Sequence, residues 1–181
     1  MRKTFLRHLL WLPLFFLFGT KAFAGDNDSL KAQMIKDWQR AKAYTKAYLD
    51  KMPADKYGYR PVDSIRSFAE QMLHLAQGNV GLVSNGTGTG RIFGNRNLEK
   101  TPSAQSKDSV MYFVMASYDY CIDGIRKMDA SKFDEVVKAG PFSETRRAWV
   151  LKAFEHQTHH RGQCTIYIRL QGVTPPNEML F

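Results

Sequence analysis

The sequence EHQTHHRGQCTIYIR, Glu155–Arg169, is the stretch from which both the fold and the site of this 181-residue chain can be predicted. His156 and His160 lie four residues apart, on an inward stripe that continues through Cys164 and Tyr167, as in an amphipathic α-helix. On a helix this separation places the two Cβ atoms roughly 5–6 Å apart on one face. Two imidazoles so placed can converge on one metal ion at about 2.0–2.1 Å from each nitrogen.

The spacing of His156 and His160 alone leaves the role of the pair open. Two histidines one turn apart also occur as helix-capping or core residues, so those interpretations stand beside metal binding. Two common metalloprotease patterns are excluded, because Gln157 stands where His-Glu-x-x-His requires glutamate and His159 stands where the inverted pattern requires it. The helix therefore offers no general base of the kind that those enzymes use.

Four segments of the chain show the three- and four-residue recurrence of apolar positions that is typical of helices. Each begins near a residue that can cap a helix, such as Ser29 or Ser106. No stretch shows a convincing strand pattern, so we expect an all-α four-helix bundle. The expected helices cover about residues 29–52, 65–77, 106–128 and 143–171.

Residues 78–105 form the longest stretch without a periodic pattern, and four of its glycines lie between Gly86 and Gly94. We expect a long loop here. Three interpretations stay open: a linker, a mobile flap over a site, and a phosphate-binding loop. The third is the weakest, because the segment has neither a Gly-Lys-Ser/Thr sequence nor a dinucleotide fingerprint. A second connection is expected at residues 129–143.

A third ligand is needed if the histidine pair is part of a catalytic zinc-type site, which commonly has three protein ligands and one open position. Downstream of the N-terminal segment, the other histidines are His74 and His159. His159 projects to the side of the stripe that carries His156 and His160, so His74 is the remaining candidate. His74 lies off the apolar stripe of its own helix. That position fits a ligand at the mouth of a cleft and also fits a histidine that faces solvent.

The N-terminus has the pattern of a secretory signal peptide. Arg2, Lys3 and Arg7 precede an apolar run at residues 9–18, and Ala22-Phe23-Ala24 supplies small residues for cleavage after Ala24. The run is about half the roughly 20 residues that a transmembrane helix needs, so no membrane association is expected after cleavage. We expect a periplasmic or secreted protein with a single domain at residues 25–181.

Removing residues 1–24 lowers the formal net charge from +9 to +5, because that segment holds four Lys or Arg residues and no Asp or Glu. A charge of this size without a Lys/Arg block argues against nucleic-acid binding. Two cysteines remain, Cys121 and Cys164. On antiparallel helices joined near residues 130–142 they would be offset by about 20 Å, which exceeds the roughly 7 Å that a disulfide allows. Both are therefore expected to be free.

The C-terminal part of the chain carries a signature that a known family shares, and several upstream segments match the same family. These residues resemble the DinB/YfiT-like superfamily of bacterial four-helix-bundle proteins, and the likeness covers nearly all of residues 29–176. The chain departs from that family in its N-terminal signal and in its Gly86–Gly94 insertion. The matching segments are His156-x-x-x-His160-Arg161-Gly162-Gln163, Tyr167-x-Arg169-Leu170-x-Gly172, Pro175-Pro176, Met52-Pro53-Ala54-Asp55, Arg60-Pro61, Ser64-Ile65 and His74-Leu75-Ala76.

The resemblance implies an up-down-down-up bundle that binds a divalent metal ion, Zn²⁺ or Ni²⁺, through His74, His156 and His160. Members of the superfamily include thiol-dependent S-transferases and isomerases. We therefore expect a metal-dependent hydrolase or thiol-type transferase that acts on a small molecule. The alternative is a non-catalytic exported protein that binds a metal ion or a small ligand. Bundle dimers are common, so a homodimer is a further expectation.

Two residues near the histidine pair are candidates for a supporting role. Gln163 lies close to the ligand stripe and can hold an imidazole or a water molecule by a hydrogen bond. Arg161 points away from the stripe, so a contact with a neighbouring helix or a carboxylate is favoured over one with substrate. A general base cannot be assigned, and solvent-facing roles are favoured for the acidic candidates, which are Asp119, Asp123 and Glu70.

Overall fold

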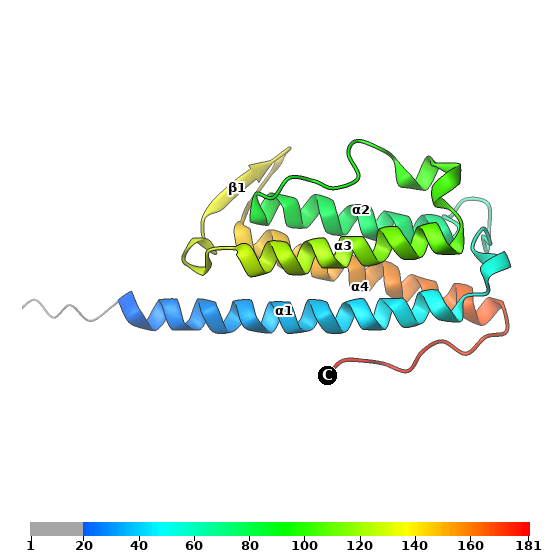
Figure 1. Cartoon of the computed structure of the whole chain (residues 1–181), viewed down its shortest axis with the longest axis horizontal. Coiled ribbons are helices and arrows are strands. Elements are labelled where there is room, and N and C mark those ends of the chain that lie inside the picture. Colours follow the sequence, from blue (N-terminus) through cyan, green and yellow to red (C-terminus); the bar gives the residue numbers. More distant parts are fainter. Residues whose placement is uncertain (1–19) are drawn as a thin grey trace, which may run out of the picture.

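The computed structural model describes residues 20–181, with side chains from Asp26 onward. The predicted signal peptide, residues 1–24, therefore lies almost wholly outside the described residues. Four long helices lie lengthwise beside one another, and a short hairpin projects from one end (Figure 1). None of the described helices is both long enough and apolar enough to cross a membrane.

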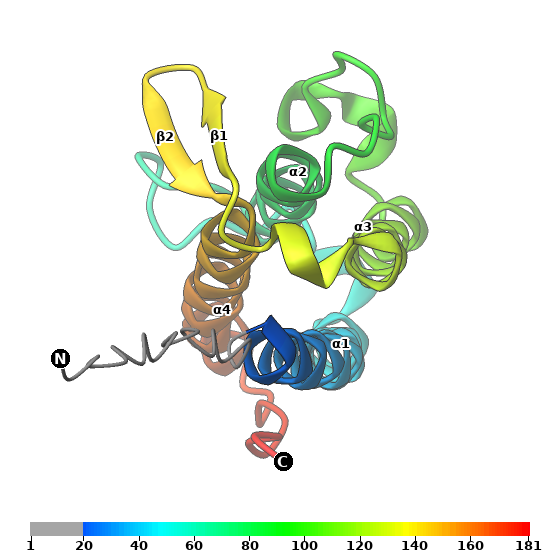
Figure 2. The ribbon, with the colours of Figure 1, turned by 90° about the vertical axis from the view of Figure 1, so that its left-hand side faces the viewer.

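The four helices enclose one hydrophobic core. Viewed along their axes, they occupy the corners of a square in which α1 adjoins α3 and α4, and α2 adjoins the same two helices (Figure 2). Fully buried side chains from all four helices fill the space between them; the largest on each are Trp38, Phe68, Tyr118 and Ile168. The expectation of a predominantly helical protein is therefore confirmed.

Helix α1 spans Thr20–Lys51 and begins earlier than the start predicted at about Ser29. It ends before Pro53, as the sequence predicts, because proline cannot donate to the helix and restricts the residue before it. The loop that follows folds back onto the core, where the buried Tyr57 hydroxyl donates to the Leu49 carbonyl at 2.7 Å.

Helix α2 spans Phe68–Thr87, so the predicted range of 65–77 was wrong at both ends. Ser67, rather than a residue just before position 65, caps the helix, in a capping box with Glu70. At the other end, Gly78, Gly81 and Gly86 do not interrupt the helix. Two of these glycines contact α4, and the helix stops only at the left-handed glycine that follows Thr87.

The loop that follows α2 is shorter than predicted and covers residues 88–106. It contains two 3₁₀ turns, η2 (Leu98–Lys100) and η3 (Pro102–Ala104). Leu98 is fully buried, and its backbone amide donates to Gln77 Oε1 on α2 at 3.0 Å. This part of the loop is thus fixed on the outer face of α2.

Helix α3 spans Lys107–Lys127 and is capped by Ser106, as predicted. The connection that follows holds the 3₁₀ turn η4 (Ala130–Lys132) and two strands, β1 (Val136–Ala139) and β2 (Phe142–Thr145), which pair antiparallel. This hairpin was not predicted from the sequence, because its strands are short, none of their residues is buried, and polar and apolar residues alternate little. Trp149 fixes it to the last helix by donating to the Val137 carbonyl at 3.1 Å.

Helix α4 spans Arg146–Leu170 and is capped by Thr145 rather than by Ser143, because Ser143 belongs to β2. Cys121 on α3 and Cys164 on α4 are both buried and free, which confirms the prediction for the cysteines.

Candidate metal centre

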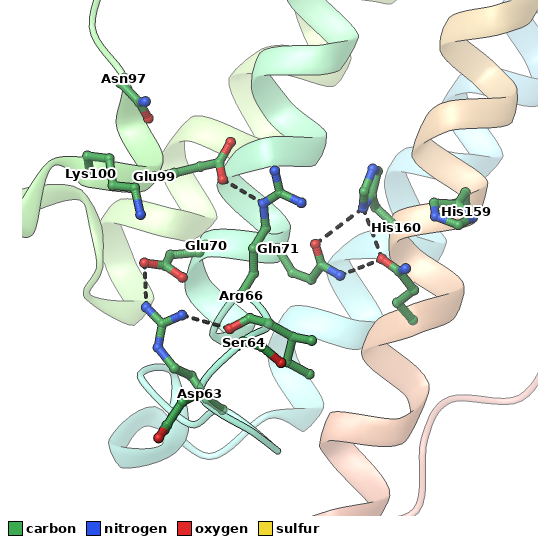
Figure 3. A pocket seen from close by; sticks show the side chains of 13 residues that line it. Asp63, Ser64, Arg66, Glu70, Gln71, Asn97, Glu99, Lys100, His159 and His160 are labelled. Carbon is green, nitrogen blue, oxygen red and sulfur yellow. Dashed lines mark hydrogen bonds and ion pairs between the residues drawn. The ribbon is translucent and has the colours of Figure 1, made fainter.

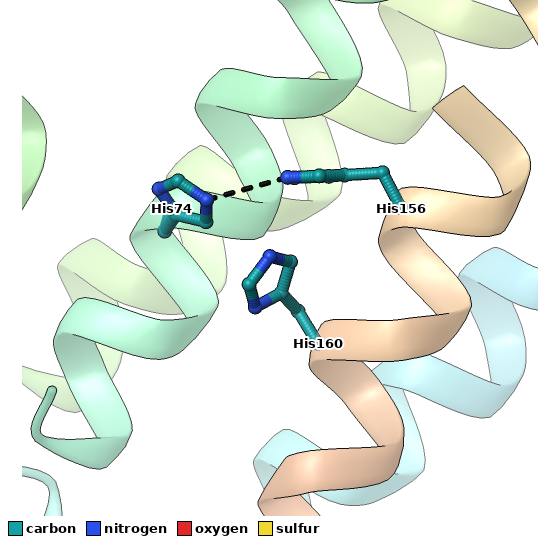
Figure 4. Close-up of side chains that lie close together, drawn as sticks. All are labelled: His74, His156 and His160. Carbon is teal, nitrogen blue, oxygen red and sulfur yellow. Dashed lines mark hydrogen bonds between the residues drawn. The ribbon is translucent and has the colours of Figure 1, made fainter. Parts of the chain in front are cut away.

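Three imidazoles from two helices meet between α2 and α4. His74 comes from α2, and His156 and His160 come from successive turns of α4. One ring nitrogen of each lies within 4.8 Å of the corresponding nitrogens of the other two. Figure 4 shows the three rings turned toward a common point. The structure thus brings together the three histidines selected from the sequence, and this group could hold a metal ion.

A glycine on α2 makes room for the histidines on α4. A Cβ atom built on Gly78 would lie 2.1 Å from Cε1 and 2.5 Å from Nδ1 of His156. Any residue other than glycine at position 78 would collide with the imidazole in its present position. The glycine that suggested a loop in the sequence instead lets the backbone of α2 approach the ring.

The distance between the ring nitrogens of His74 on α2 and His156 on α4 suits a shared ion. The Nε2 atoms of His74 and His156 lie 3.3 Å apart, a separation that also allows a hydrogen bond between the rings. Two nitrogens bound tetrahedrally to one ion at 2.0–2.1 Å are about 3.3–3.4 Å apart. His74 and His156 therefore need no backbone movement to bind the same ion.

Burial keeps two of the three rings uncharged. Burial, together with smaller contributions from His74 and His159, lowers the pKa of His156 to about 4. Burial also lowers the pKa of His160 to about 3, with contributions from His156 and His74. Both rings are neutral at pH 7, and neutral imidazole is the form that binds metal ions.

Glu99, which was not among the residues selected from the sequence, orients His74. Its Oε1 lies 2.7 Å from Nδ1 of His74, and its Oε2 accepts from Nε of Arg66 at 2.6 Å. Burial raises the pKa of Glu99, but the hydrogen bonds from Arg66 and His74 outweigh it, and the pKa falls below its ordinary value. An ionised Glu99 accepts a hydrogen bond from Nδ1–H of His74, so the lone pair of Nε2 points into the group. No short motif marks this glutamate, since it lies 25 residues beyond its partner.

Two glutamines orient His160 in the same way. The side-chain oxygens of Gln71 and Gln163 lie 3.2 Å and 3.1 Å from Nδ1 of His160. Both are acceptors, so Nδ1 carries the proton and Nε2 is free for a metal ion. Gln71 also donates to Gln163, which connects α2 to α4. The supporting position expected for Gln163 is thus the one it occupies, whereas Gln71 was not selected from the sequence.

Arg161 lies elsewhere. It is 5% exposed, its guanidinium donates to Gln157 Oε1 at 2.9 Å, and it stacks on the ring of Tyr44 at 4.4 Å. This arginine ties α4 to α1 and has no hydrogen bond to any of the three histidines among the described residues.

The carboxylates considered as general bases also lie outside the group. Asp119 pairs with Lys42 at 2.5 Å, and Asp123 pairs with Arg126 on the surface. Glu70 belongs to the cap of α2. None of the three forms a hydrogen bond with the histidines within the part of the chain that the structure describes.

A cleft of about 740 Å³ opens beside His160. Its walls combine residues of the α1–α2 loop, the start of α2, the η2 turn and α4, and several are charged (Figure 3). His159, which does not belong to the three-histidine group, also lines this cleft and is exposed. The volume lies within the range of small-molecule sites. The charged residues that line it are Arg60, Asp63, Arg66, Glu70, Glu99 and Lys100.

Fold and site together define a helical protein with a three-histidine group, suited to a metal ion, at the edge of a charged cleft. The model of the DinB family matches residues 26–179. The chain therefore belongs to the DinB family.

Solved structures with a similar fold are DinB-like proteins and a conserved bacterial protein. A DinB-like protein of Bacillus cereus has a TM-score of 0.68 and 16% identity, covering 80% of this chain and 95% of that chain. The DinB-like protein YjoA of Bacillus subtilis has a TM-score of 0.61 and 20% identity, covering 82% and 96%. A conserved protein of Enterococcus faecalis has a TM-score of 0.63 and 14% identity, covering 77% and 95%. The comparison with curated proteins found no match.

Proposed function

We propose that this DinB protein binds one divalent metal ion, Zn²⁺ or Ni²⁺, through His74, His156 and His160 and uses it in a hydrolase or thiol-type transferase reaction on a small molecule. The observation that carries the proposal is the convergence of three ring nitrogens within 4.8 Å. A bound ion would act as a Lewis acid that activates water or a thiol, or that polarises a substrate carbonyl.

The surrounding residues prepare the histidines for this role. Glu99 holds the proton of His74 on Nδ1, and the oxygens of Gln71 and Gln163 hold that of His160 on Nδ1. Two lone pairs therefore face the centre of the group before any ion arrives, which reduces the reorganisation that binding requires.

Proton transfer in such an enzyme would fall to His159. Its imidazole lines the cleft beside His160, with the two ring centroids 4.9 Å apart, and it is exposed to solvent. An imidazole carries one nitrogen that can accept a proton and one that can donate it, so a side chain at this position has the groups that general acid–base catalysis needs. Replacing His159 with Gln should lower turnover and leave the metal content unchanged.

The competing proposal is a non-catalytic protein that sequesters a metal ion or a small ligand. It is favoured by the state of Glu99, the carboxylate nearest to the group, which is engaged by both His74 and Arg66 and is not free to act as a base. Persistent inactivity on ester, amide and thiol-transfer substrates, together with tight metal binding, would support sequestration.

The proposal also covers the topology of the bundle and the cellular location of the protein. We propose an up-down-down-up four-helix bundle, supported by Figure 1, in which α1 and α4 begin at the end opposite to α2 and α3. We also propose an exported protein, cleaved after Ala24, that functions in the periplasm or outside the cell as a monomer or homodimer without nucleic acid. Sequencing the N-terminus of the exported protein tests the cleavage, since the mature chain should begin at Gly25.

The metal site is tested by substitution of His74 with Ala and measurement of the metal content of the purified protein. The wild type should retain about one ion per chain, and the variant should lose most of it. An unchanged metal content in the variant would refute the three-histidine site. Far-UV circular dichroism of both proteins shows whether the variant is folded.

A further inference from the structure

Arg66 lines the cleft and is held by hydrogen bonds of both its backbone and its side chain. Its backbone carbonyl accepts a hydrogen bond from the Tyr167 hydroxyl of α4 at 2.7 Å. Its side chain donates through Nε to Glu99 Oε2 at 2.6 Å. The guanidinium is thereby fixed beside the carboxylate that orients His74.

The outer part of this guanidinium is free. Within residues 26–181, neither terminal amino group of Arg66 donates a hydrogen bond, and the side chain is 40% exposed. Arg60, in the same cleft, differs: its Nη1 donates to the Ile65 carbonyl at 2.7 Å and its Nη2 to Glu70 at 2.6 Å. In the view of Figure 3, the Arg66 guanidinium lies between Glu99 and His160, which both line the cleft.

A guanidinium in this state matches one type of ligand group. Two free amino groups on a rigid plane can donate in parallel to the two oxygens of a carboxylate, in a charge-assisted bidentate contact. The charged side chains that line the cleft balance, three basic (Arg60, Arg66 and Lys100) against three acidic (Asp63, Glu70 and Glu99). A divalent ion would add positive charge that imidazole ligands, which are neutral when they bind a metal, do not offset, and it would therefore favour an anionic group there.

We propose that Arg66 is a substrate-binding residue that holds a carboxylate of a small molecule whose reacting group lies at the three-histidine group. This inference rests on the proposed function, because the metal ion would hold the other end of the molecule. It assigns the substrate to the class of small carboxylic acids with a second, metal-directed group.

The proposal can be tested by binding, without a known substrate. We would titrate the full processed chain, loaded with Co²⁺, with acetohydroxamate and with hydroxamates that carry a terminal carboxylate on linkers of increasing length. The visible absorption of Co²⁺ reports binding of the hydroxamate. The best carboxylated hydroxamate should bind about tenfold more tightly than acetohydroxamate, the fold-change expected for one charge-assisted contact.

Substitutions in the cleft assign this preference to Arg66. Arg66→Gln should abolish the preference for the carboxylate, expressed as the ratio of the affinities for the carboxylated hydroxamate and acetohydroxamate in the same Co²⁺-loaded variant, so that any change in the metal site through Glu99 affects both affinities alike. Lys100→Gln removes the same charge from the same cleft without removing the fork, and it should keep most of the preference. Arg66→Lys, which keeps the charge and loses the planar fork, should restore only part of it.

The outcomes separate this inference from the proposal on which it rests. If Co²⁺ does not bind, both fail. If acetohydroxamate binds but the carboxylate adds nothing, or if Arg66→Gln retains the preference, the metal site stands and the role of Arg66 is refuted. An equal loss of the carboxylate preference in Lys100→Gln would also refute it, because the preference would then come from the overall positive charge of the metal-loaded cleft and not from the Arg66 guanidinium. A phosphonate analogue that binds more tightly than the carboxylate would overturn the choice of carboxylate.

Discussion

Glu99 lies in a loop, belongs to no metal-binding motif, and yet contacts His74, the histidine that α2 contributes to the proposed metal site. Its carboxylate joins His74 to Arg66 through hydrogen bonds of 2.7 Å and 2.6 Å. A carboxylate behind a ligating histidine fixes the tautomer and raises the basicity of the ring. Glu99 should therefore act on metal affinity without touching the ion.

Replacing Glu99 with Gln should weaken metal binding by about 10- to 100-fold, the usual effect of losing such a carboxylate. The amide can still accept from His74, but it carries no charge. Competition with a chromogenic chelator measures the change. Glu155→Gln makes the same chemical change at an exposed site on α4 and should leave the affinity unchanged. Equal affinities for wild type and Glu99→Gln would show that Glu99 serves only to fix the loop.

Gly78 offers a second test at the scale of single residues. Gly78→Ala would place a methyl group 2.1 Å from the ring of His156, so that ring must move and metal affinity should fall. Gly81→Ala lies one turn along the same helix, where a Cβ meets nothing within 4 Å. That control should raise the free energy of unfolding by about 0.5–1 kcal/mol. Tight metal binding by Gly78→Ala, measured by the same competition, would contradict the observed position of His156.

At the scale of elements, α2 shows what the sequence reveals and what it conceals. Its apolar stripe was recognised, and so was the cap of α3 at Ser106. Its own cap at Ser67 and its last ten residues were not, because glycine signals both a loop and a close approach of two helices. The two meanings can be told apart only when the partner is known, and here the partner is the ring of His156 on α4.

The cap of α2 should make stability depend on pH. Glu70 accepts from the amide of Ser67 and from Arg60. Burial raises the pKa of Glu70, but these two contacts outweigh it and leave the pKa below 4.5. The folded state therefore holds this proton less tightly than the unfolded chain. The stabilisation is present above about pH 4.5 and is lost as the pH falls through the lowered value.

Urea unfolding at about pH 6 and about pH 3 tests this dependence. Between these values Glu70→Gln should lose less stability than wild type, because it has no carboxyl group to protonate at this position. Glu155→Gln, at an exposed position, should lose as much as wild type. Parallel losses in wild type and Glu70→Gln would remove Glu70 as the source of the effect.

At the scale of the whole molecule, the three histidines join the two helices that carry the site. An ion bound to His74 on one helix and to His156 and His160 on the other should stabilise the folded state, because the unfolded chain does not hold the three rings together. Free metal at about 100 times its dissociation constant should raise the free energy of unfolding by about 2.7 kcal/mol.

Thermal unfolding with and without added metal measures this gain. His74→Ala should lose most of it, whereas His159→Gln, which alters a histidine outside the group, should keep it. A metal-dependent increase of the same size in His74→Ala would place the stabilising ion elsewhere on the chain.

The sequence led to the three histidines more directly than to the residues around them. His156 and His160 follow from helical spacing, and His74 followed from the need for a third imidazole and from the family resemblance. The same reasoning could not find Glu99, Gln71 or the unpaired amino groups of Arg66. Their roles depend on how a loop folds over α2 and on how α2 packs against α4. The hairpin at residues 136–145 was missed because its strands are short and none of their residues is buried.

The central claim is that His74, His156 and His160 bind one divalent ion, and X-ray absorption spectroscopy of the metal-loaded protein tests it most directly. We predict a first shell that contains three imidazole nitrogens at about 2.0–2.1 Å, with one imidazole lost in each of the single variants His74→Ala, His156→Ala and His160→Ala. A shell made mainly of oxygen atoms, or one that stays the same in all three variants, would contradict the claim.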